Sequence, residues 1–412
     1  MFINYFIADL GKGTMKIIFY RYGSICEPDA LLVFQRMKVE VLEERFEMEN
    51  KFAATDIKIR HLVENLIDNT RKGKISFVFS MNFFPYVSEL CEKLSIMYVC
   101  WSIDCPVLEL YSKTLKNKCN RVFLFDRIQY EELNSYNPEK VFYLPLATNV
   151  ERWDKEIAKI SDKDKEKYAS DVSFVGSLYS EKSPLSLKLY ADLSEYVQGY
   201  IQGIVEAQLQ VYGYNFLREV ITTELITELK RVFPDYYSLQ DSLIDMDRFV
   251  AANYYLGMLV SESERIRLLN KLANVSHVTL YTRSDVSSLP NVICRGGITT
   301  HEQMPRVFNL SKINLNITMK GIQSGLPLRI YDVMGCGGFL LTNYQQEIPM
   351  YFEIGKDLEC YDSIDDCVQK VQYYLSHEDK RKEIADNGYK KVKQLHTYEL
   401  RIAKMLKILF HD

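Results

Sequence analysis

Residues 320–343 read KGIQSGLPLRIYDVMGCGGFLLTN, and they predict a loop, a short apolar helix and a strand in succession. A helix N-terminus presents unpaired backbone N–H groups and roughly half a positive charge, so a loop that leads into it suits a phosphate. Arg329 would add a forked cation, and Asp332, on the same helix face, would accept hydrogen bonds from ribose hydroxyls. Together these features indicate a site for a nucleoside diphosphate. Glycine and proline also mark ordinary helix starts, so a cap followed by a buried helix is the alternative interpretation.

The composition limits the class of protein. At 412 residues the chain is long enough for two domains of roughly 150–200 residues each. Hydrophobic residues make up 47% and charged residues 26%, which is typical of a folded globular protein. The formal net charge of −4 gives no basic excess, so we expect no nucleic-acid partner.

Three further features bear on where the protein works and where it begins. Its nine cysteines show no CxxC spacing, which predicts reduced thiols in a cytoplasmic protein and no zinc site. No apolar run approaches the ~18 residues that span a bilayer, so we expect no transmembrane segment. Residues 1–14 differ in pattern from the rest of the chain, and we expect them to be an extension or a non-native segment. Either Met1 or Met15 is then the natural start.

The first part of the chain alternates short apolar runs with helical segments. Strands are predicted at 16–20, 76–80, 97–101, 122–125 and 141–144. Continuous apolar strands separated by helices indicate a parallel sheet covered on both faces, so we predict a doubly wound α/β domain over 15–148. A helix is predicted over 24–37, where Ser24 followed by Glu27 matches a capping box.

The second part repeats this pattern after a polar segment at 149–170, which we interpret as an interdomain connector. Strands are predicted at 171–176, 277–282, 291–296, 312–317 and 338–343, which indicates a second doubly wound domain over 171–385. Residues 183–260 have helical spacing and predict a helical insertion after the first strand of this domain. Helices are expected over 363–376 and 378–409, and the end of the chain, 386–412, would be a helix that closes the cleft between the domains.

Candidate site residues are indicated by the sheet topology. Ligands of open parallel sheets bind beyond the carboxyl ends of the strands, where the strand order reverses. The strand-to-helix loops with notable residues are 21–24, 102–104, 176–182 and 320–329. Gly176 and Ser177 would let a ligand approach the backbone closely. Lys182 would neutralise a diphosphate, a contact worth roughly 1.5–3 kcal/mol, or it is simply a solvated loop lysine.

The first sheet offers a carboxylate at the same kind of edge. Asp104 closes a strand and precedes Pro106, so it is a candidate general base or acceptor-binding group. A turn-stabilising role for this aspartate fits the sequence equally well. Tyr22, Gly23 and Ser24 follow the first strand and would lie on the acceptor side with it. His301 and His396 are the other candidates for proton transfer; we favour a surface or capping role for His301 and a structural role for His396.

Several motifs, in order along the chain, resemble one known family. They are MKIIFYRYGSICEPD, YVCWSIDCP, NRVFLFDR, VFYLPLATN, DVSFVGSLYSEK, SGLPLRIYDVMGCGGFLLTNYQQEIPMYF and NGYKKVKQLHTYELR. From about Met15 to the C-terminus the chain resembles the CgeB-like (spore maturation protein) glycosyltransferases. The resemblance implies a GT-B glycosyltransferase, with two Rossmann-like domains that face each other across a cleft. The N-terminal domain would hold the acceptor and the C-terminal domain a nucleotide sugar.

The resemblance also implies roles for individual residues. Lys182 takes the role of a basic residue against the donor phosphates, and Asp332 takes the acidic position of the ribose-binding helix. Many retaining relatives have glutamate at the position of Ser324 and arginine at that of Ser177, so retention or inversion stays open. The expected donor-binding residues are Gly176, Ser177, Lys182, Arg295, Ser324, Gly325, Leu326, Arg329 and Asp332, and the expected catalytic residues are Asp104, Lys182 and Arg329.

We therefore expect a sugar to pass from a nucleotide-diphosphate sugar to a glycan, a protein or a small-molecule acceptor, without a metal or another cofactor. Positioning and leaving-group electrostatics would do most of the catalysis. Asp245 and Asp247 match the DxD metal motif of a different glycosyltransferase fold, but they lie in the predicted helical insertion. The alternatives are a nucleotide-sugar 2-epimerase and a catalytically silent sugar-binding scaffold of a surface-assembly complex. The base, the sugar, the acceptor and the oligomeric state, including a homo-oligomer, stay open.

Overall fold

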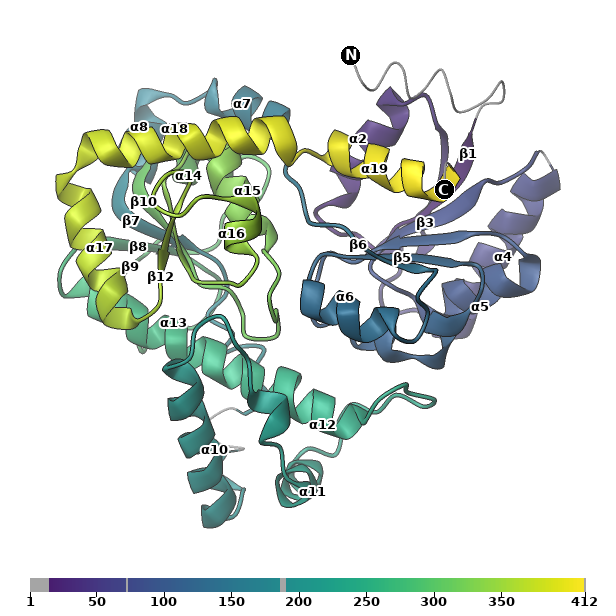
Figure 1. Cartoon of the computed structure of the whole chain (residues 1–412), viewed down its shortest axis with the longest axis horizontal. Coiled ribbons are helices and arrows are strands. Elements are labelled where there is room, and N and C mark those ends of the chain that lie inside the picture. Colours follow the sequence, from purple (N-terminus) through teal and green to yellow (C-terminus); the bar gives the residue numbers. More distant parts are fainter. Residues whose placement is uncertain (1–14, 72, 186–189, 411–412) are drawn as a thin grey trace. The chain divides into compact units, whose positions relative to one another are not determined.

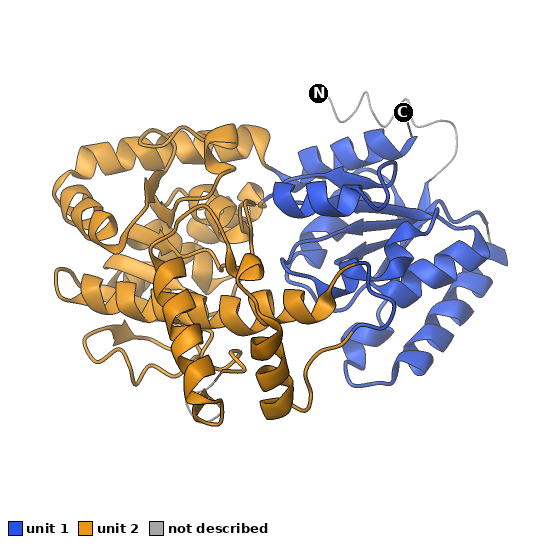
Figure 2. Cartoon of the chain, turned by 60° about the horizontal axis from the view of Figure 1, so that its bottom comes forward, with its two compact units in different colours: residues 1–147, 239–243, 397–412 blue, residues 148–238, 244–396 orange. Residues whose placement is uncertain are grey.

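The computed structural model describes residues 15–71, 73–185 and 190–410 of the chain. The chain divides into two compact units, coloured blue and orange in Figure 2. Unit 1 comprises residues 1–147, 239–243 and 397–412, and unit 2 comprises residues 148–238 and 244–396. The expectation for residues 1–14 lies outside the described ranges.

Unit 1 is built on a parallel sheet of six strands in the order β2-β1-β3-β4-β5-β6. Its strands are β1 (Lys16–Tyr20), β2 (Glu40–Glu44), β3 (Phe77–Met81), β4 (Tyr98–Trp101), β5 (Asn120–Leu124) and β6 (Val141–Tyr143). Its helices are α2 (Glu27–Arg36), α3 (Phe46–Glu49), α4 (Thr55–Arg71), α5 (Pro85–Leu94), η1 (Leu108–Tyr111), η2 (Lys113–Lys116), α6 (Arg127–Asn134) and α19 (Tyr398–Phe410). In Figure 1, α2 and α19 lie above this sheet and α5 and α6 lie below it.

The five strands predicted for the first part of the chain are all present, and a sixth was missed. β3 reads FVFSM with every residue buried, which is the pattern of a parallel strand covered on both faces. The missed strand, β2, reads EVLEE and lies at the edge of the sheet, where charged side chains oppose further pairing. The predicted capping box at Ser24 is wrong, because α2 begins after Cys26 without a side-chain cap and Glu27 binds other groups.

Unit 2 contains a second parallel sheet of six strands, in the order β12-β11-β10-β7-β8-β9. Its strands are β7 (Ser170–Val175), β8 (Val278–Tyr281), β9 (Ile293–Cys294), β10 (Ser311–Asn316), β11 (Leu340–Asn343) and β12 (Glu359–Tyr361). Its helices are α7 (Val150–Ile157), α8 (Asp162–Tyr168), α10 (Glu195–Leu209), η3 (Leu217–Glu219), α11 (Thr223–Val232), α12 (Met246–Val250), η4 (Ala251–Leu256), α13 (Gly257–Ala273), α14 (Gln303–Leu310), α15 (Leu328–Gly335), α16 (Ile348–Tyr351), α17 (Ile364–Ser376) and α18 (Glu378–Leu395). The predicted doubly wound α/β class is confirmed for both units.

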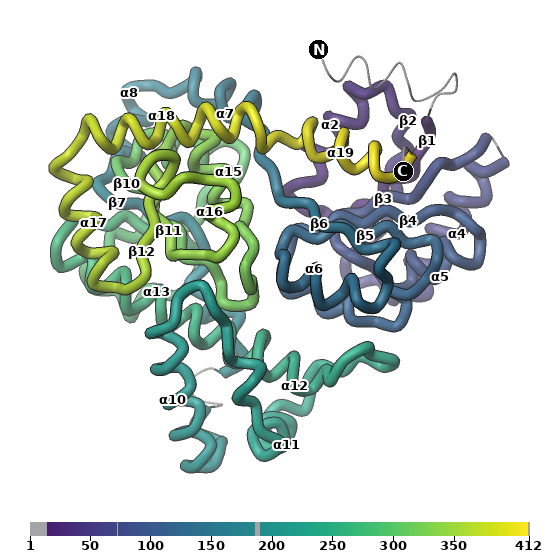
Figure 3. The backbone as a smooth tube through the Cα atoms, viewed as in Figure 1, coloured from purple at the N-terminus to yellow at the C-terminus, as the bar shows by residue number. Residues whose placement is uncertain are grey.

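The helices of unit 2 refine three expectations. The polar segment 149–170 holds α7 and α8, and the described part of 183–260 contains the helices α10, η3, α11, α12 and η4 together with loops, with α10 and α11 below the sheet in Figure 1. The single helix predicted over 378–409 is wrong. α18 ends at Leu395, and Thr397 starts α19 by accepting a hydrogen bond from Arg401 N (3.2 Å). Figure 3 traces the chain into α19, which lies beside α2 within unit 1.

The stretch 320–343 forms a loop, α15 and β11, as predicted. A Cβ atom at Gly338 would lie 2.5 Å from the carbonyl oxygen of Phe308 and 2.6 Å from Asn314 Nδ2, so a larger residue does not fit there. Gly337 has a φ of +71°, in the left-handed region that glycine adopts without strain. These two requirements explain the glycine pair between the helix and the strand.

Candidate functional site

The strand order of unit 2 reverses between β7 and β10. From β7 the chain continues to β8 and β9 on one side and later to β10, β11 and β12 on the other. In such a sheet a ligand binds at the carboxyl ends of the two strands beside the reversal. The loops at these ends are residues 176–182 and 317–327, which include most of the expected donor-binding residues.

The loop after β7 is a compact turn. Ser177 Oγ donates to Glu181 Oε1 (2.7 Å) and accepts from Tyr179 N (2.8 Å), and Tyr179 adopts a φ of +71°. Lys182 is exposed, and its Nζ lies 5.5 Å from the centre of the Tyr179 ring. Within the described ranges Lys182 makes no ion pair, so its charge is available to an anion at this loop.

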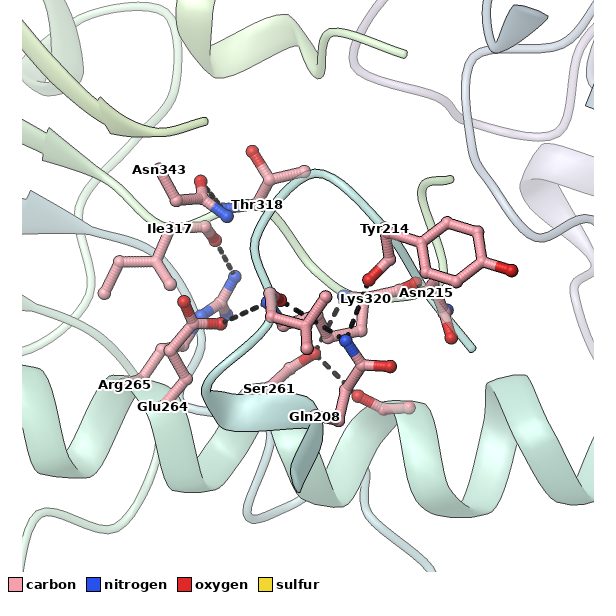
Figure 4. Close-up of polar contacts among 12 residues, drawn as sticks. Gln208, Tyr214, Asn215, Ser261, Glu264, Arg265, Ile317, Thr318, Lys320 and Asn343 are labelled. Atoms are coloured by element: carbon pink, nitrogen blue, oxygen red, sulfur yellow. Dashed lines mark hydrogen bonds and ion pairs between the residues drawn. The ribbon is translucent and has the colours of Figure 1, made fainter. Parts of the chain in front are cut away.

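The loop after β10 is fixed on several sides (Figure 4). Ser261 Oγ, on α13, accepts from Lys320 N (3.0 Å), and Asn215 donates to the carbonyl oxygen of Lys320. Asn343, at the end of β11, accepts from Thr318 N (2.8 Å) through its Oδ1 atom. The backbone of this loop is therefore held in place before any ligand binds.

Two charged side chains of α13, which the sequence analysis missed, lie beside this loop (Figure 4). Glu264 is only 1% exposed, and its Oε2 lies 3.3 Å from Lys320 Nζ in a buried ion pair. Arg265 is also buried and donates from Nη1 to the carbonyl oxygen of Ser177 (2.5 Å) and from Nη2 to that of Ile317 (2.6 Å). One guanidinium group thus joins the ends of β7 and β10.

Arg329 lies on α15, and the residue as a whole is partly exposed. Its guanidinium group is 5.1 Å from the centre of the Phe308 ring and also contacts Met304 Sδ. Burial lowers the pKa of the Arg329 guanidinium, the carboxylate of Asp332 opposes this shift, and the positive charge of Arg265 adds to it. No ion pair of Arg329 with a carboxylate is found in the part of the chain that the structure describes.

The carboxylate of Asp332 is buried and oriented by α7 and the residues before it. Thr148 Oγ1 donates to Asp332 Oδ1 (2.6 Å) and accepts from Trp153 Nε1 (2.6 Å). Because both partners belong to unit 2, this chain of hydrogen bonds fixes one oxygen of Asp332 within the unit itself.

Ser324, Gly325 and Leu326 lead into α15 and are all buried. Ser324 Oγ donates to Glu347 Oε1 (2.6 Å), so a buried carboxylate from the segment after β11 lies beside the position of Ser324. Sequence reasoning missed Glu347, because it stands 23 residues away along the chain. Arg295 is exposed beyond β9, at the edge of the sheet and two strands from β7.

His301 precedes α14 and contacts α7. Its Nδ1 lies 2.8 Å from Arg152 Nη1, and its ring stacks at 6.3 Å from that of Trp153. Burial, followed by the positive charge of Arg152, lowers the pKa of His301. We expected a surface or capping role for His301, and the capping role is wrong because the N-cap of α14 is Glu302.

Two of the predicted acceptor-side residues of unit 1, Tyr22 and Asp104, both contact Asn82, which sequence reasoning missed. Asn82 Nδ2 donates to Tyr22 OH (2.8 Å) and to Asp104 Oδ2 (2.7 Å), and its Oδ1 accepts from Ile103 N (2.9 Å). One amide thereby joins the carboxyl ends of β1, β3 and β4. Burial, and then the charge of Asp104, raises the pKa of the Tyr22 phenol, so it stays protonated. An asparagine directly after a buried strand was the available sequence clue.

Glu27 shapes the loop that carries Gly23 and Ser24. Its carboxylate accepts from Tyr22 N (2.9 Å), from Gly23 N (3.2 Å) and from Arg21 Nε (3.1 Å). The Glu27 carboxylate is thus bound by the two loop amides and the guanidinium group, whereas the capping-box pattern predicted that it would accept a hydrogen bond from Ser24 N.

The DxD pair has local structural roles. Asp245 is the N-cap of α12 and accepts from Arg248 N (3.1 Å), and Asp247 pairs with Lys230.

Comparisons with known proteins bear on the fold and on the class of protein. Residues 264–407 match the family model described as glycosyl transferase-like. HepE of Anabaena, solved in complex with UDP, has a TM-score of 0.53 at 9% identity, and the match covers 96% of this chain and 100% of HepE. A glycosyltransferase of Rickettsia africae has a TM-score of 0.50 at 10% identity, covering 97% of this chain and 100% of that one. Sucrose-phosphate synthase of Thermosynechococcus elongatus has a TM-score of 0.50 at 9% identity, covering 96% of this chain and 99% of that one. No curated protein matches the chain in sequence.

The solved structures define the fold as that of GT-B glycosyltransferases. The match of residues 264–407 to the glycosyl transferase-like family model identifies the chain as a glycosyltransferase. Its glycosyl transferase-like domain contains Arg265, Arg329 and Asp332, whereas Gly176 and Lys182 precede the matched residues. No helix in the described ranges is both long and apolar enough to cross a bilayer.

Proposed function

We propose that this glycosyltransferase takes its sugar from a nucleoside-diphosphate sugar bound at the loops after β7 and β10. The observation that carries the proposal is the cluster of positively charged side chains near Tyr179. Arg265 Cζ lies 4.2 Å and Lys182 Nζ 5.5 Å from the centre of its ring, and Arg329 is close enough for Arg265 to influence its pKa. These three cations make no ion pair with a carboxylate of the described residues. A diphosphate would supply the missing negative charge.

In this proposal Arg329 and Lys182 stabilise the charge that develops on the leaving diphosphate. The backbone at Gly176, Ser177 and Ser324–Gly325–Leu326 lies against the phosphates, Asp332 binds the ribose hydroxyls, and the base lies toward Arg295. On unit 1, Asp104 acts as general base for a glycan, protein or small-molecule acceptor bound beside Tyr22, Gly23 and Ser24. HepE was solved with UDP, which supports UDP-sugars as the first donors to test.

Three further points belong to the proposal. Transfer needs no metal, because the side-chain cations supply the positive charge that the leaving group requires; turnover that EDTA abolishes would overturn this point. The motifs quoted above support a place in the CgeB-like group. The nine free cysteines support a cytoplasmic location for the protein.

The test is thermal stabilisation across a panel of UDP, GDP, dTDP, ADP and CMP sugars. A ligand at ~100 times its dissociation constant should add ~2.7 kcal/mol to the free energy of unfolding. We expect a selective shift, and we expect Arg329→Ala to weaken binding of the selected nucleotide roughly 10- to 100-fold while the fold survives.

The matched control is Arg306→Ala, on the neighbouring helix α14. Arg306 already pairs with Asp164 (3.2 Å) and Glu156 (3.7 Å), so its loss should leave nucleotide affinity unchanged. If no nucleotide stabilises the protein, or if Arg329→Ala binds as tightly as the wild type, the proposed donor site is wrong.

A further inference from the structure

Arg265 occupies an unusual position for a helix side chain. It is 6% exposed, and its guanidinium group donates hydrogen bonds to two backbone carbonyl oxygens, those of Ser177 (2.5 Å) and Ile317 (2.6 Å). Ser177 follows β7 and Ile317 follows β10, so the side chain bridges the two strands where the order of the sheet reverses. Its Nε atom is buried without a hydrogen-bond partner.

The helix that carries Arg265 approaches the loop after β10 along one face. Asn253 Oδ1 accepts from Gln323 Nε2 (3.3 Å), and Ser261 Oγ, eight residues later, accepts from Lys320 N (3.0 Å). Between them, a Cβ atom at Gly257 would lie 3.9 Å from the backbone nitrogen of residue 321. Asn253 lies in η4, which continues directly into α13, and Gly257, Ser261 and Arg265 lie in α13. The four residues recur at intervals of four, so they lie along one side of this continuous helical segment. The sequence left the role of the helical insertion open. Its last residues and the start of α13 contact the loop after β10.

The electrostatics of this arrangement favour an anion. Carbonyl oxygens at the carboxyl ends of parallel strands carry partial negative charge, and Arg265 takes up two of them. Its neighbour Glu264 is already paired with Lys320, and no carboxylate of the described residues forms an ion pair with Arg265. A buried cation without a counter-ion is costly, and a bound anion would offset that cost.

We propose that Arg265 is the positioning residue of the diphosphate site: it fixes the loops after β7 and β10 relative to each other and holds a buried positive charge beside the phosphates. The proposal rests on the donor site proposed above. Arg265 acts by holding the backbone at Ser177 and Ile317 and by the electrostatic attraction of its charge for the phosphates. Its loss should therefore weaken donor binding more than it slows the transfer step. Lysine is a poor substitute, because one ammonium group cannot reproduce the planar fork that reaches both carbonyl oxygens.

The first test compares Arg265→Lys with the wild type in two assays. Titration calorimetry with the nucleoside diphosphate that stabilises the wild type should give a dissociation constant roughly 10- to 100-fold higher in the variant. In steady-state assays KM for the donor should rise by a similar factor while kcat changes little, the pattern of an interaction made equally in the ground and transition states. The matched control is Arg267→Lys, on the same helix, where the arginine pairs with Glu206 on the surface. Its affinity should equal that of the wild type.

A second variant separates positioning from a general loss of packing. Arg265→Ala should bind the same nucleoside diphosphate weakly, and added methylguanidinium should restore part of the affinity. Methylammonium at the same concentration should restore less.

A third measurement needs no variant. In the wild type, the nucleoside diphosphate should slow amide hydrogen exchange in both 177–182 and 317–323. Arg265→Lys that binds like the wild type, a failure of methylguanidinium to rescue folded Arg265→Ala, or exchange in these loops that the nucleotide leaves unchanged would each overturn the role of Arg265. A wild type that binds none of the nucleotides would instead overturn the donor site itself.

Discussion

His301 links pH to the stability of unit 2. In the folded chain its pKa is lowered, first by burial and then by Arg152, whereas an unfolded histidine titrates near ~6.5. The unfolded state therefore binds more protons than the folded state around and below that pH. Stability contributed by neutral His301 is present above the unfolded pKa and is lost as pH falls through this window.

We expect the free energy of unfolding of the wild type to fall more steeply between about pH 7.5 and about pH 5.5 than that of His301→Gln. Glutamine keeps a hydrogen-bonding group near Arg152 but does not titrate. Urea denaturation at several pH values, followed by fluorescence, measures both slopes. Parallel slopes would show that His301 does not carry the effect.

For the candidate site, sequence reasoning pointed mainly to residues that lie in or near a loop after a strand. Gly176, Lys182 and Arg329 lie in or just after strand-to-helix loops, so the topology rule pointed to them directly. Arg265 stands in the helical run SESERIRLLNK, whose charges are typical of a solvated helix face, and its burial depends on a loop more than 50 residues later. The small residues Gly257 and Ser261, four apart before it, were the only local clue to a close approach.

At the scale of elements, α18 packs closely against α15 because Gly388 has no side chain. An added Cβ atom would lie 2.4 Å from the carbonyl oxygen of Asp357 and 3.1 Å from Met334 Sδ. A backbone oxygen cannot move aside as a flexible side chain can, so the helix itself would have to shift.

Gly388→Ala should therefore destabilise the protein by about 1–3 kcal/mol, although alanine favours a helix more than glycine does. Gly199→Ala is the matched control, because Gly199 lies in α10 and a Cβ atom there would meet nothing within 4 Å. That variant should be neutral or up to ~1 kcal/mol more stable. Urea denaturation of both variants measures the difference, and an equal gain in both would refute the packing argument.

Elements with regular apolar runs were predictable, and short or charged ones were not. Every strand expected from an apolar run is present, whereas β2 and β12 were missed. β2 carries three glutamates, and β12 has only three residues, so neither shows the apolar run that marks the central strands. The break between α18 and α19 was missed because the hydrophobic spacing continues across it. The start of α19 depends on the hydrogen bond that the carbonyl oxygen of Thr397 accepts from Arg401 N.

At the scale of the whole molecule, the two tryptophans of the chain report on different units. Trp101 ends β4 of unit 1, and Trp153 lies on α7 of unit 2. In Trp153→Phe the remaining Trp101 reports on the unfolding of unit 1, and in Trp101→Phe the remaining Trp153 reports on the unfolding of unit 2.

Leu406→Ala should lower the stability that Trp101 reports by about 2–5 kcal/mol, because Leu406 of α19 is fully buried in unit 1. The effect on the signal of Trp153 should be smaller. Leu400→Ala is the control on the same helix, since Leu400 is 39% exposed and should cost little. Equal losses at both tryptophans would show that the units unfold as one.

The place of α19 has a consequence for protein synthesis. Tyr398 of this helix packs 5.7 Å from the ring of Trp101, and its last residues reach Phe77 on β3, so α19 covers part of the sheet of unit 1. A ribosome delivers the strands of that sheet first and α19 only after residues 148–396. At translation rates of about 5–20 residues per second, the uncovered apolar surface would stay exposed for roughly 10–50 s on each nascent chain. During that interval the growing chain offers a binding surface to chaperones and to other nascent chains.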